Sequence, residues 1–346
     1  MAQITQKEIA ESLGINRVTV TKALKGHPDI SQNTIEKVRK LAEEKGYVPN
    51  ILSRNLALKK TNMIGFVVPK LFNSFCASAI EAAHETALEE GFQIIPMITY
   101  EDPEIEKQAV KTLLSFNVDG IVIDITENTH DFSIFKWVKE KKVPLLFMDR
   151  FPEKEDFHRI ITNDFEIAYE ATTDLLKQGY QRIAYIDTHA HLNIGKHRYD
   201  GFAKAMGDAG QKINGGFIHK GAIAEKTGMD VLDHWVAQDL KPDALICSTL
   251  SSAIGAHKQA RKHKIKIPEQ LAIITFGEKE MAQLLTPSLS IYHVPVRKMA
   301  TKATQMIIRK SRDKSYRIPK VVSYKAKLYQ GESMKSEELK VKSYKL

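Results

Sequence analysis

From Met63 onward the sequence alternates short apolar runs with longer amphipathic stretches, and this alternation limits the possible folds more than any other feature. Neighbouring parallel strands need a crossover of about a dozen residues or more, usually a helix, so the pattern predicts βα units in parallel, doubly wound sheets. The expected strands lie within 63–69, 92–98, 118–125 and 143–149 in a first series, and within 158–164, 181–187, 243–249 and 270–277 in a second. The expected helices lie within 78–91, 103–117, 167–180, 198–210 and 251–264. Two series of about 100 residues each, without a long low-complexity linker, predict two α/β lobes around a cleft, the usual place for a small ligand.

The first 60 residues follow a different pattern, that of short helices with their own start and stop signals. Thr5 and Glu8 have the spacing of a capping box, and Gly14 suits the end of the helix that follows. Another helix is predicted to begin after Ser31, a good N-cap. The apolar residues are Ile9, Ala10 and Leu13 in the first of these helices, and Ile35, Val38, Leu41 and Ala42 in the last. Each helix therefore has one apolar face to bury.

The stretch between them, NRVTVTKALKG at residues 16–26, could be a strand or a helix. Its Val-Thr-Val-Thr alternates as a half-buried strand does, whereas Asn16 favours the start of a helix and Gly26 its end. A helix over 17–25 would turn Val20, Ala23 and Leu24 inward, and Arg17, Val18, Thr21, Lys22 and Lys25 outward. The alternation then divides into two helix faces, and the three segments form a helix-turn-helix with a supporting helix.

The net charge is unevenly distributed along the chain. The whole sequence carries +9, from 51 Lys and Arg against 42 Asp and Glu. Residues 1–60 hold 11 basic and 6 acidic residues, a balance of +5, which leaves +4 for the other 286 residues. Such asymmetry is the electrostatic footprint of a surface that binds a polyanion, because each neutralised phosphate releases counterions.

Several other classes of protein lack support in the sequence. No run of 18 apolar residues occurs and the N-terminus has no apolar stretch behind a basic start, so we expect no export, no membrane insertion and a cytoplasmic protein. Cys76 and Cys247 are expected to be free thiols. His189, His191 and His197 could bind a metal, but they have neither a CxxC partner nor HExxH spacing, so we expect no metal and no cofactor.

Motifs of common enzymes are also missing. The chain has no GxGxxG, no Walker-type GxxxxGK and no GxSxG. Asp149 and Glu278 could be an acid/base pair, but carboxylates in a sugar cleft more often accept hydrogen bonds than catalyse hydrolysis. We therefore expect that the protein is not an enzyme, and we keep a sugar-acting enzyme only as a remote alternative.

A contiguous stretch from Thr5 to Pro69 resembles the lac-repressor-like (LacI/GalR) family of transcription regulators: TQKEIAESLGINRVTVTKALKGHPDISQNTIEKVRKLAEEKGYVPNILSRNLALKKTNMIGFVVP. The resemblance spans nearly the whole chain. It implies a helix-turn-helix head over 1–49, a hinge helix or linker over 50–61, and a two-lobed, periplasmic-binding-protein-like (type I) core over 62–332. The chain is expected to cross between the lobes near 161, 293 and 320, so that one lobe comprises 62–161 with 294–319 and the other 162–293 with 320–332. Residues 333–346 are expected to form a disordered tail.

The resemblance also implies how the head binds DNA. Arg17, Val18 and Lys22 take the base-reading positions in the major groove, with Lys22 where many family members have arginine. Leu56 takes the position of a wedge in the minor groove, although it could instead pack on the following domain. The rest of the expected DNA-binding set, most of it near phosphates, is Thr5, Asn16, Thr21, Ser31, Thr34, Tyr47, Asn50 and Arg54.

For the effector, the resemblance points to Asn73 and Phe75 after the first strand, and to Asp149, Arg198, Thr249, Gly277 and Glu278. The late positions depart from the family, with Gly277 in place of a frequent aspartate and Val294 in place of a frequent glutamine. These changes make an unmodified sugar a weaker candidate for the effector, because its hydroxyl groups would lack partners and unpaired polar groups in a closed site are costly. Arg198 with Lys196 and His197 could instead bind a phosphate or carboxylate, or could be a solvated basic helix start.

Taken together, these features predict a homodimeric, sequence-specific DNA-binding regulator, expected to be a repressor, that binds a near-palindromic double-stranded operator. Its operator affinity is expected to be set by a sugar, a sugar derivative or a sugar phosphate between the lobes. The alternative keeps the DNA-binding head but replaces the small molecule by a protein partner. The C-terminal residues lack leucine heptads, so we expect a dimer and no tetramer.

Overall fold

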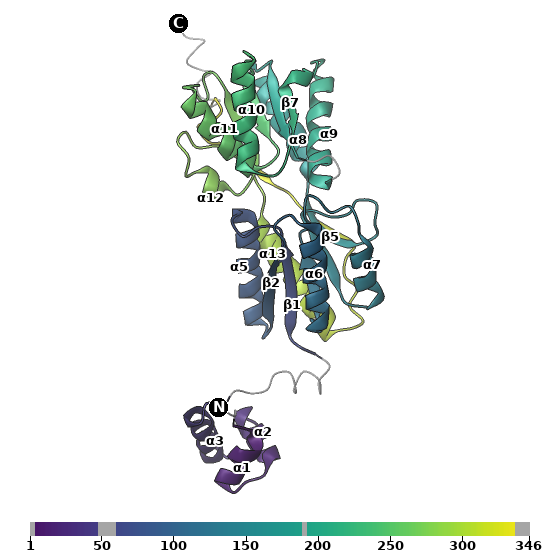
Figure 1. Ribbon diagram of the computed structural model, residues 1–346, viewed down its shortest axis with the longest axis vertical. Coiled ribbons are helices and arrows are strands. Elements are labelled where there is room, and N and C mark those ends of the chain that lie inside the picture. The colour runs from purple at the N-terminus through teal and green to yellow at the C-terminus, as the bar shows by residue number, and fades with distance from the viewer. Residues whose placement is uncertain (1–3, 48–59, 189–191, 336–346) are drawn as a thin grey trace. The chain divides into compact units, whose positions relative to one another are not determined.

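The computed structural model describes residues 4–47, 60–188 and 192–335, and the chain divides into two compact units, 1–61 and 62–346. In the first unit three helices follow one another, α1 (Gln6–Leu13), α2 (Arg17–Leu24) and α3 (Gln32–Glu44) (Figure 1). The three predicted helices are confirmed, including the one over the Val-Thr-Val-Thr stretch. The expected hinge helix falls almost entirely on residues 48–59, outside the described residues.

Local capping explains why these short helices start where they do. The backbone N–H of Thr5 donates to Glu8 Oε2 at 2.6 Å, and the N–H of Glu8 donates to Thr5 Oγ1 at 3.3 Å, which completes the predicted capping box. The side chain of Asn16 accepts from the N–H of Thr19 at 2.8 Å and so starts α2 despite the β-branched residues that follow. The inward side chain of Val20 is fully buried in the core of this unit.

The second unit contains two sheets, each of six strands within the described residues (Figure 1). The first has the order β11-β5-β4-β3-β1-β2 and the second the order β12-β10-β9-β8-β6-β7. The first comprises β1 (Met63–Val68), β2 (Gln93–Ile98), β3 (Gly120–Ile123), β4 (Leu145–Met148), β5 (His158–Thr162) and β11 (Val321–Tyr324). The second comprises β6 (Ile183–Asp187), β7 (Ile218–Lys220), β8 (Ala244–Cys247), β9 (Ala272–Gly277), β10 (Ser290–His293) and β12 (Lys327–Tyr329). All pairs are parallel except β10 with β12, which confirms the expected class of parallel α/β sheets.

Helices cover both faces of each sheet, because successive residues of a buried strand point to opposite faces. In the first lobe, apolar residues of α5 (Ser74–Glu89) and α13 (Val296–Arg312) share a core with one face, and those of α6 (Pro103–Ser115) and α7 (Ser133–Glu140) share a core with the other. In the second lobe the same holds for α8 (Asp164–Lys177) with α9 (Asn193–Asp208), and for α10 (Glu225–Ala237) with α11 (Leu250–Lys262). Two short helices complete it, η1 (Gly215–Phe217) and α12 (Lys279–Ala282).

The chain passes between the lobes three times: from β5 to α8, from β10 to α13, and from β11 to β12. The third crossing, expected near 320, lies a few residues later, between Tyr324 and Lys327. The strand Val321–Tyr324 pairs in parallel with Arg159–Thr162 of β5, so the chain stays in the first lobe until Tyr324. The stretch VVSYKAKLY, which looks like one β segment, therefore forms two strands of different sheets.

The expected start of a disordered tail at 333 is also wrong. Ser333 is fully buried and Met334 is nearly so. The N–H of Ser290 donates to Ser333 Oγ at 2.8 Å, which ties this end of the chain to β10. The rest of the expected tail, 336–346, lies outside the described residues.

The structure also bears on the expectations for the cysteines and for membrane insertion. Cys76 and Cys247 are buried free thiols, as predicted, and burial raises the pKa of both. A bilayer-spanning helix, which would have to be long and largely apolar, is not found among the described residues.

Candidate functional site

The outward face of α2 presents the predicted base-reading residues. Arg17 is exposed, and Val18 exposes 65% of its surface although it is a large apolar residue. The core of the head does not use Arg17 or Val18, because Val20 and Ala23 on the opposite face fill it. An apolar and a guanidinium group side by side can contact a thymine methyl and a guanine edge.

Lys22 has a partner that sequence reasoning missed. Its Nζ lies 3.1 Å from Asp29 Oδ2, and both side chains are largely exposed. The hydrogen bond from Lys22, together with the nearby charges of His27 and Lys22, holds the pKa of Asp29 below its ordinary value. A base or phosphate would therefore have to compete with Asp29 for Lys22.

Several expected phosphate-contacting residues are helix caps in the head. Thr5, Asn16 and Ser31 each accept a backbone N–H at the start of a helix. Thr34 shares a hydrogen bond with Ser31 at 2.8 Å between the two hydroxyl oxygens. The hydroxyl of Thr21 donates within the head, with Gln6 Oε1 at 2.9 Å. Tyr47 packs on the core of the head, and the expected residues Asn50, Arg54 and Leu56 lie outside the described residues.

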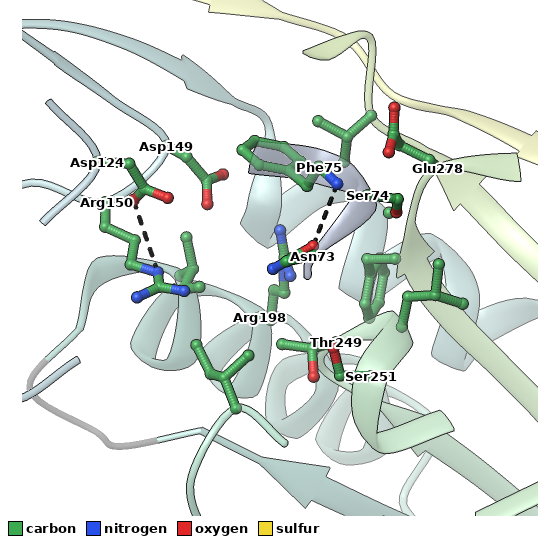
Figure 2. Close-up of a pocket in the computed structure, with 16 residues that line it drawn as sticks. Asn73, Ser74, Phe75, Asp124, Asp149, Arg150, Arg198, Thr249, Ser251 and Glu278 are labelled. Atoms are coloured by element: carbon green, nitrogen blue, oxygen red, sulfur yellow. Dashed lines mark hydrogen bonds and ion pairs between the residues drawn. The ribbon is translucent and has the colours of Figure 1, made fainter. Parts of the chain in front are cut away.

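All seven expected effector residues line one cavity of the second unit (Figure 2). They are Asn73, Phe75, Asp149, Arg198, Thr249, Gly277 and Glu278. Asp149 and Glu278 directly follow β4 and β9, and Thr249 comes two residues after β8, so the cavity lies at the carboxyl ends of strands from both sheets, where ligands of doubly wound folds bind. Its other lining residues include Asp124, Arg150, Ser251 and Phe276, which sequence reasoning missed. Asp124 follows β3 directly, so the same carboxyl-end rule could have found it.

Arg198 lies across this cavity and is already paired. Its Nε and Nη2 lie 2.8 and 2.7 Å from Asp164 Oδ1, and its Nη1 donates to the carbonyl of Ser248 at 2.5 Å. Its guanidinium group lies 5.0 Å from the centre of the Phe276 ring. The free space left in the cavity is about 60 Å³, enough for a few water molecules.

The phosphate-binding group suggested for Arg198, Lys196 and His197 is not formed. His197 Nε2 lies 2.6 Å from Glu153 Oε1, and Lys196 Nζ lies 3.6 Å from the same oxygen. Both neighbours thus pair with Glu153, away from the cavity lining, while Arg198 alone is buried and lines the cavity. His189 and His191, weighed as metal ligands, lie outside the described residues.

A second buried arginine organises the acidic groups of the first lobe. Arg150 Nη1 donates to Glu101 Oε2 at 3.1 Å, and its Nε lies 3.6 Å from Asp124 Oδ1. Burial raises the pKa of Asp124 well above its ordinary value, although the charge of Arg150 opposes this. The cavity therefore contains two arginines, both held by carboxylates.

Asp149 lines the cavity directly after β4. Its backbone has φ 67°, in the left-handed region that non-glycine residues adopt rarely. Burial raises the pKa of Asp149 to about 6, an effect opposed by the charges of Arg198 and Arg150 and strengthened by that of Asp164. A polar ligand that donates a hydrogen bond here would replace the water that burial has removed.

Hydrogen bonds join the two lobes beside the cavity. Asn193, at the start of α9, accepts from the N–H of Phe151 at 2.9 Å and donates to the carbonyl of Asp149 at 3.0 Å. Glu127 of the first lobe accepts from the N–H of Ile223 of the second lobe at 2.8 Å. The lobes are thus held together around the cavity.

A basic helix-turn-helix head followed by a two-lobed core with a polar interlobe cavity defines the class of ligand-controlled DNA-binding proteins. The family model for bacterial regulatory proteins of the lacI family matches residues 5–50, and that for periplasmic binding protein-like domains matches residues 172–334. The transcriptional repressor PurR of Vibrio parahaemolyticus is 27% identical over 315 residues, which cover 90% of this chain and 93% of that protein.

Solved structures show the same fold. The lac repressor dimer bound to operator and the anti-inducer ONPF has a TM-score of 0.84 at 19% identity, over 96% of this chain and 99% of that chain. The transcriptional regulator CelR in complex with cellobiose has a TM-score of 0.73 at 20% identity, over 96% of this chain and 100% of that chain. The chain belongs to the LacI family of bacterial regulatory proteins; it is a DNA-binding transcriptional repressor and not an enzyme.

Proposed function

We propose that this repressor binds a near-palindromic operator as a homodimer, in the cytoplasm where that DNA is found, and that a small polar effector in the interlobe cavity sets its operator affinity. The observation that carries the proposal is the convergence of seven residues, separated by up to about 200 positions in the chain, on one cavity at the carboxyl ends of both sheets. An effector that favours one arrangement of the lobes changes DNA affinity through that preference.

In the head, Arg17, Val18 and Lys22 are proposed to read bases, because they share the outward face of α2. The caps Thr5, Asn16 and Ser31, with Thr21, Thr34, Tyr47, Asn50 and Arg54, are proposed to lie near phosphates. Leu56 keeps its proposed role as a wedge in the minor groove. Two copies of the head would read two half-sites.

Exposed apolar residues of the second unit support the homodimer. Phe72 is fully exposed, and Leu71, Tyr100, Met281 and Leu284 are also exposed. These residues lie on or next to α5, β2 and α12. In Figure 1, α5 and α12 are on the same side of the second unit, and β2 is an edge strand of its sheet. Exposed apolar side chains beside an open sheet edge favour burial against a second copy.

A sugar is the first candidate for the effector. The cavity offers carboxylates and hydroxyls to sugar hydroxyl groups, and the rings of Phe75 and Phe276 to its apolar face. CelR, of the same fold, binds cellobiose. A nucleobase-type effector is the second candidate, since the curated relatives are repressors named PurR and such a base also donates N–H groups in one plane. A sugar phosphate is less favoured, because both cavity arginines are already paired.

Operator selection from random DNA, followed by anisotropy measurements with a panel of sugars and nucleobases, tests the proposal. We expect a near-palindromic site and a change in its Kd of about fivefold or more with at least one compound. If no compound acts and a protein from cell extract changes operator affinity instead, the protein-partner alternative replaces the small-molecule effector.

A further inference from the structure

The arginines of the cavity have ionic partners, whereas some of its carboxylates have none among the described residues. Arg150 and Arg198 are its only lining lysines or arginines among the described residues, and each is held by carboxylates outside or beside the cavity. Three carboxylates, of Asp124, Asp149 and Glu278, also line it. Acidic side chains in and around the cavity therefore outnumber its two arginines, and among the described lining residues no unpaired cation is left to receive an anionic ligand.

Asp149 has no hydrogen-bond partner for its carboxylate among the described residues, although the charges of Arg198 and Arg150 lie near it. Its side chain points into the cavity in Figure 2, although only 9% of the residue is exposed. Its left-handed backbone conformation is of the kind that persists at functional sites because the surroundings maintain it. Of the charged groups nearby, Arg198 is paired with Asp164, and Arg150 is paired with Glu101 and Asp124.

Glu278 is a second acceptor without a partner. It follows β9, only 6% of it is exposed, and its Oε2 is buried without a hydrogen bond to any described residue. Figure 2 shows it on the opposite side of Phe75 from Asp149. Buried acceptors without donors are uncommon in folded proteins, because leaving them unpaired is costly.

We infer that the effector of this cavity carries a cationic nitrogen, an ammonium or amidinium group, which donates to the carboxylate of Asp149 while other donors of the effector reach Glu278. The inference rests on the proposed function and specifies its ligand. A cationic nitrogen has only donors, so it suits unpaired acceptors, and its charge complements the surplus of acidic side chains. A neutral hydroxyl supplies the hydrogen bond without the charge, and a phosphate supplies neither.

The pH dependence of binding follows from the same group. Burial raises the pKa of Asp149 to about 6, so the carboxylate that receives the cation forms only as the pH rises through that value. Affinity for a cationic probe should therefore increase from pH 5 to about 7 and then level off, as long as the probe keeps its proton.

Matched probe sets test the inference on the full chain. Glucosamine, galactosamine and mannosamine are each compared with their neutral parent hexose, N-acetyl form and 6-phosphate, and putrescine is compared with butanediol, by thermal shift and calorimetry. We expect at least one amine to bind, and to bind roughly tenfold tighter than its neutral and anionic counterparts. Asp149→Asn should weaken that amine by roughly 30-fold and remove the rise in affinity near pH 6.

Asn is a suitable replacement because it has the size of Asp and tolerates the left-handed conformation. Glu278→Gln should weaken the amine less, and Glu269→Gln, which removes an exposed carboxylate outside the cavity, should leave its affinity unchanged. The inference is overturned if no amine binds, if a neutral or phosphorylated member binds as tightly as the amine, or if Asp149→Asn retains full affinity. A neutral sugar that alters operator affinity would overturn only this inference, whereas the absence of any small-molecule effect on operator binding would overturn the proposed function.

Discussion

At the scale of the residue, α2 separates folding from the proposed recognition: Val20 and Ala23 fill the core, whereas Arg17 and Val18 are exposed. The inward face of α2 is fully used by the core of the head, so the outward face can vary without loss of the fold. Changes on that face should therefore alter DNA binding and leave stability within about 0.5 kcal/mol of the parent.

Arg17→Ala should lower operator affinity by about 1–3 kcal/mol and relax the preference at one base pair, because a guanidinium group discriminates guanine by two hydrogen bonds. Anisotropy titrations with the selected operator and with random DNA measure both effects. Lys7→Ala, which removes an exposed charge of the same unit, controls for net charge. An equal loss on both DNAs would make Arg17 a phosphate contact.

Asp187 should make stability depend on pH. It is 2% exposed at the end of β6, and burial raises its pKa to about 7, opposed by a hydrogen bond from the N–H of Thr188. The folded state then holds a proton that the unfolded chain has released, so the free energy of unfolding falls as the pH rises from about 4 to about 7.

Asp187→Asn should remove on the order of 2 kcal/mol of this pH dependence, because the amide does not titrate. Urea unfolding across that pH range measures the slope. A variant with the slope of the parent would show that Asp187 ionises normally in the folded protein.

The position of Arg198 in the cleft could be predicted, but its partners could not. The family resemblance places the residue, whereas Asp164 comes from another helix 34 residues earlier, and no local pattern links the two. The same holds for Lys22, whose pairing with Asp29 depends on the turn between α2 and α3. Sequence periodicity predicts which face of a helix a residue occupies. An ion pair depends on how two elements pack together, which periodicity does not predict.

At the scale of the element, the contact of α10 with α11 is set by two glycines. A Cβ on Gly228 would lie 1.9 Å from the carbonyl oxygen of Ser252, and one on Gly255 would lie 1.9 Å from that of Glu225. The obstructing atoms are backbone, so the helices would have to separate.

Gly228→Ala should therefore destabilise the second lobe by about 1–3 kcal/mol, through overpacking. Gly207→Ala is the matched control, since a Cβ at this position of α9 meets no atom within 4 Å; it should stabilise by up to about 1 kcal/mol through helix propensity. Urea unfolding of both variants measures the difference. Equal stabilities would show that the helices separate at no cost.

Most strands and helices of the core could be predicted, since their periodicity is local. The expected elements do not include the helices α7, α10 and α13 or the strands β7 and β10. A different kind of exception lies where local pattern and topology differ. Residues 321–329 look like one strand, yet two residues between Tyr324 and Lys327 carry the chain into the other sheet. A crossing this short leaves no signal in composition, which is why its position was misjudged.

At the scale of the whole molecule, the proposed dimer gives the clearest prediction. Phe72→Ser should shift the protein from dimer to monomer, because it removes a fully exposed apolar side chain from the proposed interface. Operator affinity should fall with it, since one head reads only one half-site.

Sedimentation analysis and operator titration of the same samples measure both effects. Phe116→Ser, at an exposed aromatic after α6, is the control and should change neither. A Phe72 variant that remains dimeric would place the interface elsewhere on the second unit.

The nearly filled cavity has a consequence for the speed of the response. Its free space of about 60 Å³ admits water but neither a sugar nor a nucleobase, and Asn193 and Glu127 hold the lobes together around it. Exchange of the proposed effector would therefore require those hydrogen bonds to break and the lobes to separate. Lobe motions of this kind take microseconds to milliseconds. The rate of lobe opening, and not the rate at which the effector diffuses to the protein, would therefore limit effector binding.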